Sequence, residues 1–225
     1  MEPEPDETLP MFPLRAVLIP GELLPLHIFE QRYRKMLAAR IHAVPAFGVV
    51  LVRRGREVAD QPDVESIGTA ATIVQSEQHA DGRWSIVVRG GRRFQIVDQD
   101  WREGYLIASV TWLDPLPTES VTPGAEGPVS EVKLAFDAYL MELERVAGRR
   151  IPRVDLGERP ERVGNLIASA MPFSLSDRQH LLAAPTAATR LELLLKLLRR
   201  ERALLATAGL GGALIEHPGR RFTSN

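Results

Sequence analysis

Residues 9–37 read LPMFPLRAVLIPGELLPLHIFEQRYRKML, and this stretch decides the fold predicted for the chain. Its four prolines cannot donate to a sheet ladder or lie inside a helix. The apolar residues between them are therefore expected in two short edge or bulged strands. Pro20-Gly21 predicts the turn between these strands, because proline fixes φ at the first central position and glycine accepts a positive φ at the second.

The apolar period changes near Ile28 and predicts a helix at about residues 29–41. One helix face then carries the apolar residues Phe29, Tyr33, Met36, Leu37 and Ile41. No Ser, Thr, Asp or Asn stands at its start to cap it. Its first free N–H groups must therefore bond water, another segment or a ligand.

The segments between residues 46 and 113 are rich in strand formers. Residues 46–53 form a continuous valine-rich run that predicts a central strand. Residues 65–77 and 83–98 flank Asp81-Gly82, which predicts a long antiparallel hairpin. Gly90-Gly91 interrupts the second arm, and such a pair indicates a bulge or bend that lets a sheet curl into a barrel. A last strand follows Gly104.

The strand signal stops at a region rich in Pro, Gly and Thr, and we predict a linker at residues 116–127. Apolar stripes then predict a bundle of about four helices over residues 128–209. Ser176 and Gln179 are read as a capping box for the third helix, and Gly209 as the end of the fourth. Residues 1–8 are expected to be a disordered acidic N-terminus, and residues 210–225 a flexible tail.

The opening stretch resembles the Lon protease N-terminal domain, also called the Lon substrate-binding domain. That family begins with LPLFPL, a Pro-Gly turn and a PLxIFExRYRxM-like segment, here including Phe29, Glu30, Arg32 and Tyr33. VESIGTAATIVQ, IVVRGGRRFQIVD and the helical stretch NLIASAMPFSLSDRQHLLAAPTAATRLELLLKLL extend the resemblance over most of the chain. It implies an α+β fold, with a small PUA-like twisted β-barrel at residues 9–115 followed by the helical bundle.

Composition narrows the class of protein. The 225 residues are 44% apolar, carry a net charge of −1 and contain no cysteine. This composition suits a globular core and excludes disulfides, thiol nucleophiles and cysteine-bound zinc. The start, MEPEPDET, lacks the basic and apolar regions of a signal peptide, and charges interrupt the leucine-rich run near the C-terminus. We therefore expect a cytoplasmic protein without a membrane span.

No pattern of catalytic residues is found in the sequence. The three lysines, Lys35, Lys133 and Lys196, do not follow glycine, so no phosphate-binding loop is present, and nothing around them predicts the desolvated lysine of a Ser-Lys dyad. The five histidines show no metal-ligand spacing. We predict no enzyme activity, no cofactor and no metal site.

The residues singled out for binding lie in the opening stretch: Arg15, Phe29, Glu30, Arg32 and Tyr33. One interpretation is structural, with an arginine-carboxylate pair and a buried tyrosine that tie the helix to the barrel. The other is the polar end of a peptide-binding groove. The sequence leaves both open.

The leading functional hypothesis is a non-enzymatic module that binds exposed or unfolded polypeptide segments in quality control or proteolysis. Proline-interrupted edge strands offer backbone groups for strand addition, and the resemblance implies recognition of protease or quality-control substrates. It leaves open whether a separate ATP-dependent protease is a partner that receives them. The alternatives are an RNA-binding PUA-like module and a small-molecule sensor. Asp60, Asp63, Glu65 and Asp98 lie close in sequence to the arginines near residues 53–56 and 89–93, and few aromatic residues lie among these arginines, so we do not expect a nucleic-acid partner. We also expect no membrane partner, and a monomer or homodimer.

Overall fold

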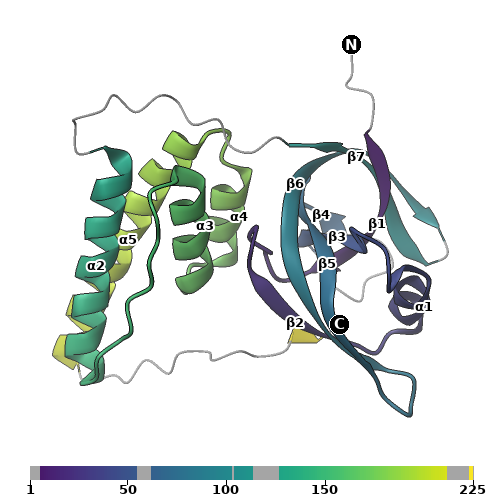
Figure 1. Cartoon of the computed structure of the whole chain (residues 1–225), viewed down its shortest axis with the longest axis horizontal. Coiled ribbons are helices and arrows are strands. Elements are labelled where there is room, and N and C mark those ends of the chain that lie inside the picture. Colours follow the sequence, from purple (N-terminus) through teal and green to yellow (C-terminus); the bar gives the residue numbers. More distant parts are fainter. Residues whose placement is uncertain (1–5, 55–61, 103, 114–126, 212–222, 225) are drawn as a thin grey trace. The chain divides into compact units, whose positions relative to one another are not determined.

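The computed structural model describes residues 6–54, 62–102, 104–113, 127–211 and 223–224. The chain divides into two compact units. Met1–Pro115 and Gly219–Asn225 form the first, and Leu116–Pro218 form the second. Figure 1 shows the strands in the first unit and a group of helices in the second. The predicted α+β class is confirmed.

A closed ring of five strands forms the first unit. β1 pairs with β3 and β7, β5 pairs with β3 and β6, and β6 pairs with β7. β2 lies outside this ring along β6, and β4 lies along β3. The strands are β1 (Glu7–Leu14), β2 (Leu23–Ile28), β3 (Phe47–Arg54), β4 (Asp63–Val64), β5 (Ile67–Gln78), β6 (Trp84–Arg102), β7 (Tyr105–Trp112) and β8 (Thr223–Ser224).

The register of β1 explains how this strand tolerates two prolines. Its residues Glu7 to Pro10 pair with β7, and Met11 to Leu14 pair with β3. Each proline, which has no N–H to donate, is therefore paired with one neighbouring strand and not with two. The strand begins at Glu7, within the stretch that we expected to be disordered.

The predicted irregularity in β6 is present. Thr69 pairs with Arg93 and Ala71 pairs with Gly90, so β6 contains one residue more than β5 across this interval. This is the two-against-one count of a β-bulge, which bends the strand that carries it. β6 runs through 19 residues and can follow both β2 and β7 because it bends.

The second unit contains four helices among the residues described: α2 (Pro128–Ala147), α3 (Pro160–Ala170), α4 (Leu175–Ala183) and α5 (Ala187–Gly211). The remaining helix, α1 (Gln31–Arg40), belongs to the barrel unit. α2 has Pro128 in its first turn and ends at Gly148, whose φ is 65°, as the sequence predicted. α5 contacts α2, α3 and α4 and so organises the bundle.

Two predicted helix boundaries were wrong. The cap of α4 is Ser174 and not Ser176: its Oγ accepts a hydrogen bond from the Asp177 N–H at 3.1 Å. The helix thus begins two residues earlier than the predicted box. α5 continues through Gly209 to Gly211, because an isolated glycine lowers helix stability without necessarily ending a helix.

A buried arginine joins three of the helices. Arg190 on α5 is 2% exposed and donates to the Leu181 and Leu182 carbonyl oxygens at the end of α4, and to Asn165 Oδ1 on α3. Its positive charge lies at a helix C-terminus, where the helix dipole favours a cation. Arg190 belongs to the stretch NLIASAMPFSLSDRQHLLAAPTAATRLELLLKLL, which resembles the Lon family, and this contact gives it a physical role.

Candidate functional site

Three of the five residues singled out in the sequence meet at the start of α1. Arg32 Nε donates to Glu30 Oε2 at 2.9 Å, and Arg32 Cζ lies 4.9 Å from the centre of the Tyr33 ring. Arg32 Nη1 also donates to the Gly104 carbonyl, 3.3 Å away in the connection before β7. The Arg32 and Glu30 side chains are 16% and 17% exposed. These contacts attach α1 to the barrel wall.

Tyr33 is fully buried, and its ring packs edge-on against Phe12 with the ring centres 4.5 Å apart. A ligand could touch this ring only if the core opened. Phe29 is 40% exposed and Arg15 is exposed, so these two residues are accessible to a ligand. Glu30 and Arg32 form an ion pair and Tyr33 is buried, which are the features expected if these three residues have a structural role. Phe29 and Arg15 lie on the surface.

The outer edge of β2 pairs with a second segment of the chain. One side of β2 pairs with β6 along its whole length. On the other side of β2, within the described part of the chain, lies β8, which pairs in parallel with Leu26 and His27. The segment from the C-terminal end of the chain thus lies on β2 as an added strand.

Residue parity along β2 shows which backbone groups face outward. The Glu22 carbonyl accepts a hydrogen bond from the Gly90 N–H of β6 at 2.9 Å. Backbone groups alternate in direction along an antiparallel strand, so Leu24, Leu26 and Ile28 also face β6. His27 then presents its N–H and carbonyl to the outer edge. Pro25, which has no N–H to donate, occupies an outward position where no β6 bond is lost.

Three exposed arginines of the barrel pair with nearby carboxylates. Arg53 pairs with Glu65 at 3.2 Å, Arg83 with Asp81 at 2.6 Å and Arg102 with Asp100 at 2.7 Å. The hydrogen bond from Arg102 lowers the pKa of Asp100. Arginines engaged in this way are poor phosphate ligands, and this arrangement does not favour a nucleic-acid face.

Two histidines that are distant in sequence come together on the barrel. His79 Nε2 lies 2.8 Å and His27 Nδ1 lies 3.4 Å from the Ser85 hydroxyl. The β2–β6 register places His27 opposite Ser85, which the histidine spacing could not reveal. No group of three or more metal-ligand side chains occurs within the described ranges.

The helical unit contains a mostly apolar groove of about 540 Å³. We name it the helical groove. Phe136, Tyr139 and Leu140 of α2 form part of its lining, together with the end of α3 and the non-helical connector, residues 148–159. Burial, followed by the charge of Glu201, raises the pKa of Tyr139. The residues that line the helical groove are Phe136, Tyr139, Leu140, Leu143, Arg149, Arg150, Ile151, Pro152, Val154, Leu156, Leu166, Ser169, Ala170, Met171 and Pro172.

Glu144 holds the connector against α2. Its Oε1 accepts hydrogen bonds from the Ile151 N–H at 2.7 Å and from Arg153 Nη1 at 3.0 Å. The backbone hydrogen bond, followed by the one from Arg153, lowers the pKa of Glu144. The Glu144 carboxylate therefore holds the connector that forms one wall of the groove.

Comparison with known proteins identifies the family. Residues 8–200 match the family model described as the ATP-dependent protease La (LON) substrate-binding domain. The chain belongs to the Lon substrate-binding domain family. The resemblance predicted from residues 9–37 and from the later segments is confirmed.

Relatives of this Lon-type domain include full-length proteases. Lon protease of Brevibacillus choshinensis is 28% identical over 200 residues, and Lon protease 2 of Myxococcus xanthus is 30% identical over 206 residues. The alignments cover 88% of this chain but 25% and 24% of those relatives. The chain thus spans about a quarter of the length of the curated relatives that it matches.

Solved structures show the same fold. A Lon N-terminal domain protein from Xanthomonas campestris matches with a TM-score of 0.62 at 26% identity, covering 84% of this chain and 98% of that one. The N-terminal domain of a Mycobacterium avium complex Lon protease matches with a TM-score of 0.63 at 22% identity, covering 86% and 98%. The predicted Lon-type α+β fold is confirmed. Over the residues described, no helix has the length and apolar character needed to cross a membrane.

Sequence reasoning did not find the helical groove of this Lon-type domain. Residues 148–159 fall within the predicted helical bundle, and no period marks them as an irregular segment that lines a groove. A usable signal was the run Arg149-Arg150-Ile151-Pro152, in which two charges precede apolar residues in a segment that cannot be helical.

Proposed function

We propose that this Lon-type domain binds exposed or unfolded polypeptide segments, without catalysing a reaction itself, in protein quality control or proteolysis. The observation that carries the proposal is the pairing of Thr223–Ser224 with the outer edge of β2. A short piece of polypeptide already binds there as an added strand. The family's description as a substrate-binding domain supports the same role.

Strand addition fits a domain that accepts many clients. Main-chain hydrogen bonds supply affinity with little dependence on sequence, while the side chains beside the strand adjust preference. Leu23, which is 52% exposed, offers an apolar contact at the start of this edge. An ATP-dependent protease separate from this chain is the partner to which we assign the bound segments.

The proposal can be tested with a permanently unfolded probe, reduced and carboxymethylated α-lactalbumin, followed by fluorescence anisotropy. His27→Pro removes an outward N–H of β2 and should weaken binding about fivefold, because one backbone hydrogen bond contributes about 1 kcal/mol. His27→Val is the matched control, since it removes the imidazole and keeps the N–H. Thr223→Pro with Ser224→Pro should strengthen binding by freeing the edge.

Three outcomes would contradict the proposal. The first is binding of the unfolded probe no tighter than binding of native α-lactalbumin, and the second is equal binding by His27→Pro and His27→Val. Alternatively, a single-stranded oligoribonucleotide could bind at sub-micromolar affinity with steep salt dependence while the unfolded probe does not bind. That last result would favour the RNA-binding alternative.

A further inference from the structure

The helical groove combines an apolar lining with positive charge. The lining contains Arg149 and Arg150 and no carboxylate. Both arginines are exposed, and the nearby Glu144 is already engaged by Arg153 and the Ile151 N–H. A complementary ligand would bring apolar groups for the lining and negative charge for the two guanidinium groups.

We propose that the helical groove is a second client-binding site, which selects an apolar polypeptide segment flanked by acidic residues. The inference rests on the proposed polypeptide-binding function and adds a site and a sequence preference to it. The groove volume of about 540 Å³ lies within the range of about 300–1,000 Å³ that is usual for binding pockets. It therefore has room for more than one apolar side chain.

The connector favours a polypeptide over a lipid. Figure 1 shows this connector as a long non-helical segment that runs beside the helices. Within this connector, Ile151 uses its N–H and carbonyl on the side chains of Glu144 and Arg153, and the Asp155 carbonyl accepts a hydrogen bond from Arg162. Val154 and Leu156, which line the groove, make no backbone hydrogen bond with another described residue. The segment that lines the groove therefore keeps backbone groups that another polypeptide backbone can bond, whereas an acyl chain cannot.

The apolar part of the groove suggests a substitution that leaves the core intact. Val154 lines the groove and is 67% exposed, so Val154→Glu places a carboxylate at the site with little change in folding stability. Leu134→Glu is the matched control: Leu134 is 63% exposed on α2 and does not line the groove.

The experiment uses the full chain and labelled peptides with a Leu-Leu-Phe-Leu core flanked by three Glu, three Gln or three Lys. We expect the Glu peptide to bind about tenfold more tightly than the Lys peptide, because each exposed charge pair adds a factor of a few at low salt. Val154→Glu should weaken the Glu peptide about tenfold, and Leu134→Glu should not.

Charge reversal tests the arginines separately. Arg149→Glu with Arg150→Glu should abolish or invert the preference for the Glu peptide. Arg199→Glu with Arg202→Glu makes the same change in net charge at exposed positions of α5 and should preserve the preference. Raising salt should reduce the difference between the peptides and leave the binding of the Gln peptide nearly unchanged.

The results distinguish this inference from the proposed function. Equal binding of the Glu and Lys peptides, or no effect of Val154→Glu, would overturn the groove assignment. The strand-addition proposal would then stand if His27→Pro still weakened binding of the unfolded probe. Tighter binding of oleate than of the Glu peptide, with displacement of that peptide, would also overturn the assignment. Failure of both the peptides and the unfolded probe to bind would overturn both proposals.

Discussion

At the scale of single residues, the barrel core depends on one aromatic ring that lies over two glycines. An added Cβ at Gly48 would lie 2.7 Å from Phe94 Cζ, and one at Gly68 would lie 2.6 Å from the same atom. Gly68 pairs with Phe94 across β5 and β6. The Gly48 Cβ would also lie 2.5 Å from Met11 Sδ, and the Gly68 Cβ 2.5 Å from the Val49 carbonyl oxygen. A side chain larger than hydrogen would therefore displace the ring together with Met11 at the first position, or with the β3 backbone at the second.

Gly68→Ala should therefore destabilise the barrel by about 1–3 kcal/mol, the usual cost of overpacking a well-filled core. The measurement is urea unfolding followed by tryptophan fluorescence. Gly91→Ala is the control on β6, since its added Cβ would lie 3.4 Å from the nearest atom, the Ala70 carbonyl oxygen. Equal stability of the two variants would show that Phe94 can move away at little cost.

The sequence predicted which glycines have a structural role, but it did not predict the contacts that explain why a glycine is needed there. Gly90 was expected to mark a bend, and the bulge is present. The same glycine also lies where an added Cβ would be 2.4 Å from the Ile19 carbonyl oxygen, a contact between segments about seventy residues apart in the chain. Local patterns carry no information about such a close approach, because it depends on register and on barrel closure.

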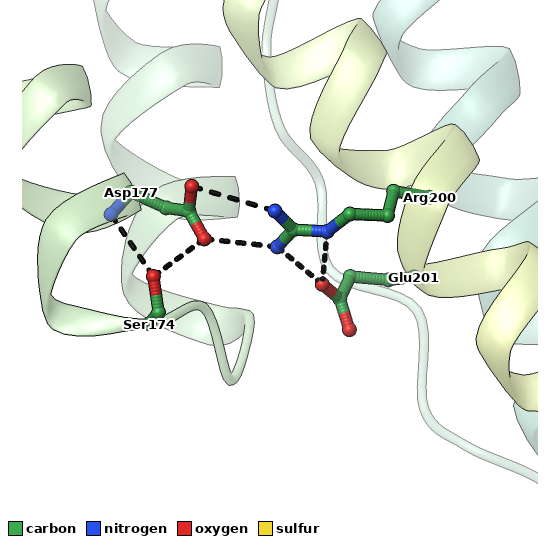
Figure 2. Close-up of polar contacts among 4 residues, drawn as sticks. All are labelled: Ser174, Asp177, Arg200 and Glu201. Atoms are coloured by element: carbon green, nitrogen blue, oxygen red, sulfur yellow. Dashed lines mark hydrogen bonds and ion pairs between the residues drawn. The ribbon is translucent and has the colours of Figure 1, made fainter.

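At the scale of elements, the short helix α4 depends on a polar network that joins it to α5. Figure 2 shows the Ser174 hydroxyl and both Asp177 oxygens, with Arg200 bridging Asp177 and Glu201. The hydrogen bond from Arg200, aided by the one from Ser174, lowers the pKa of Asp177 below its ordinary value of 3.8. The ionised carboxylate is thus favoured in the folded state.

This shift gives a signed pH dependence. Since the folded-state pKa is lowered, Asp177 stabilises the fold at pH values above about 4, and the contribution is lost as the pH falls through the folded-state pKa. Asp177→Asn should cost about 1 kcal/mol at pH 7, a small value because Arg200 is 46% exposed. The deficit relative to wild type should disappear near pH 2 in urea titrations. A deficit of equal size at pH 7 and at pH 2 would contradict this role of the Asp177 carboxylate.

Sequence patterns predicted elements well where a period repeats, and less well at their ends. The valine-rich run of β3 and the apolar stripe of α2 were located within one or two residues. The start of α4 was misplaced because Ser174 and Ser176 both carry a hydroxyl oxygen that can cap a helix. The structure shows that Ser174 is the cap, since its Oγ accepts the hydrogen bond from the Asp177 N–H. The pairing of β8 was missed because two residues are too few to form a pattern.

At the scale of the whole molecule, the chain carries one proposed binding surface in each unit. In the two proposals above, the β2 edge binds the backbone of a client polypeptide, and the helical groove binds its apolar and acidic side chains. Each surface alone is small and should bind weakly, since a few hydrogen bonds or a few apolar contacts must offset the ordering of a flexible client. A client that engages both would gain affinity through effective concentration, without any new contact.

A two-segment peptide tests this arrangement. It joins a strand-forming segment to the Leu-Leu-Phe-Leu core with three Glu through a Gly-Ser linker of increasing length. Affinity should rise to a maximum when the linker matches the span between the sites and should then fall slowly, with a peak gain of about 100-fold over either segment alone. His27→Pro and Val154→Glu should each remove most of that gain, whereas His27→Val and Leu134→Glu should keep it. An affinity independent of linker length would mean that the two surfaces do not act on one client, because a tether can add binding energy only where it lets both sites be occupied together.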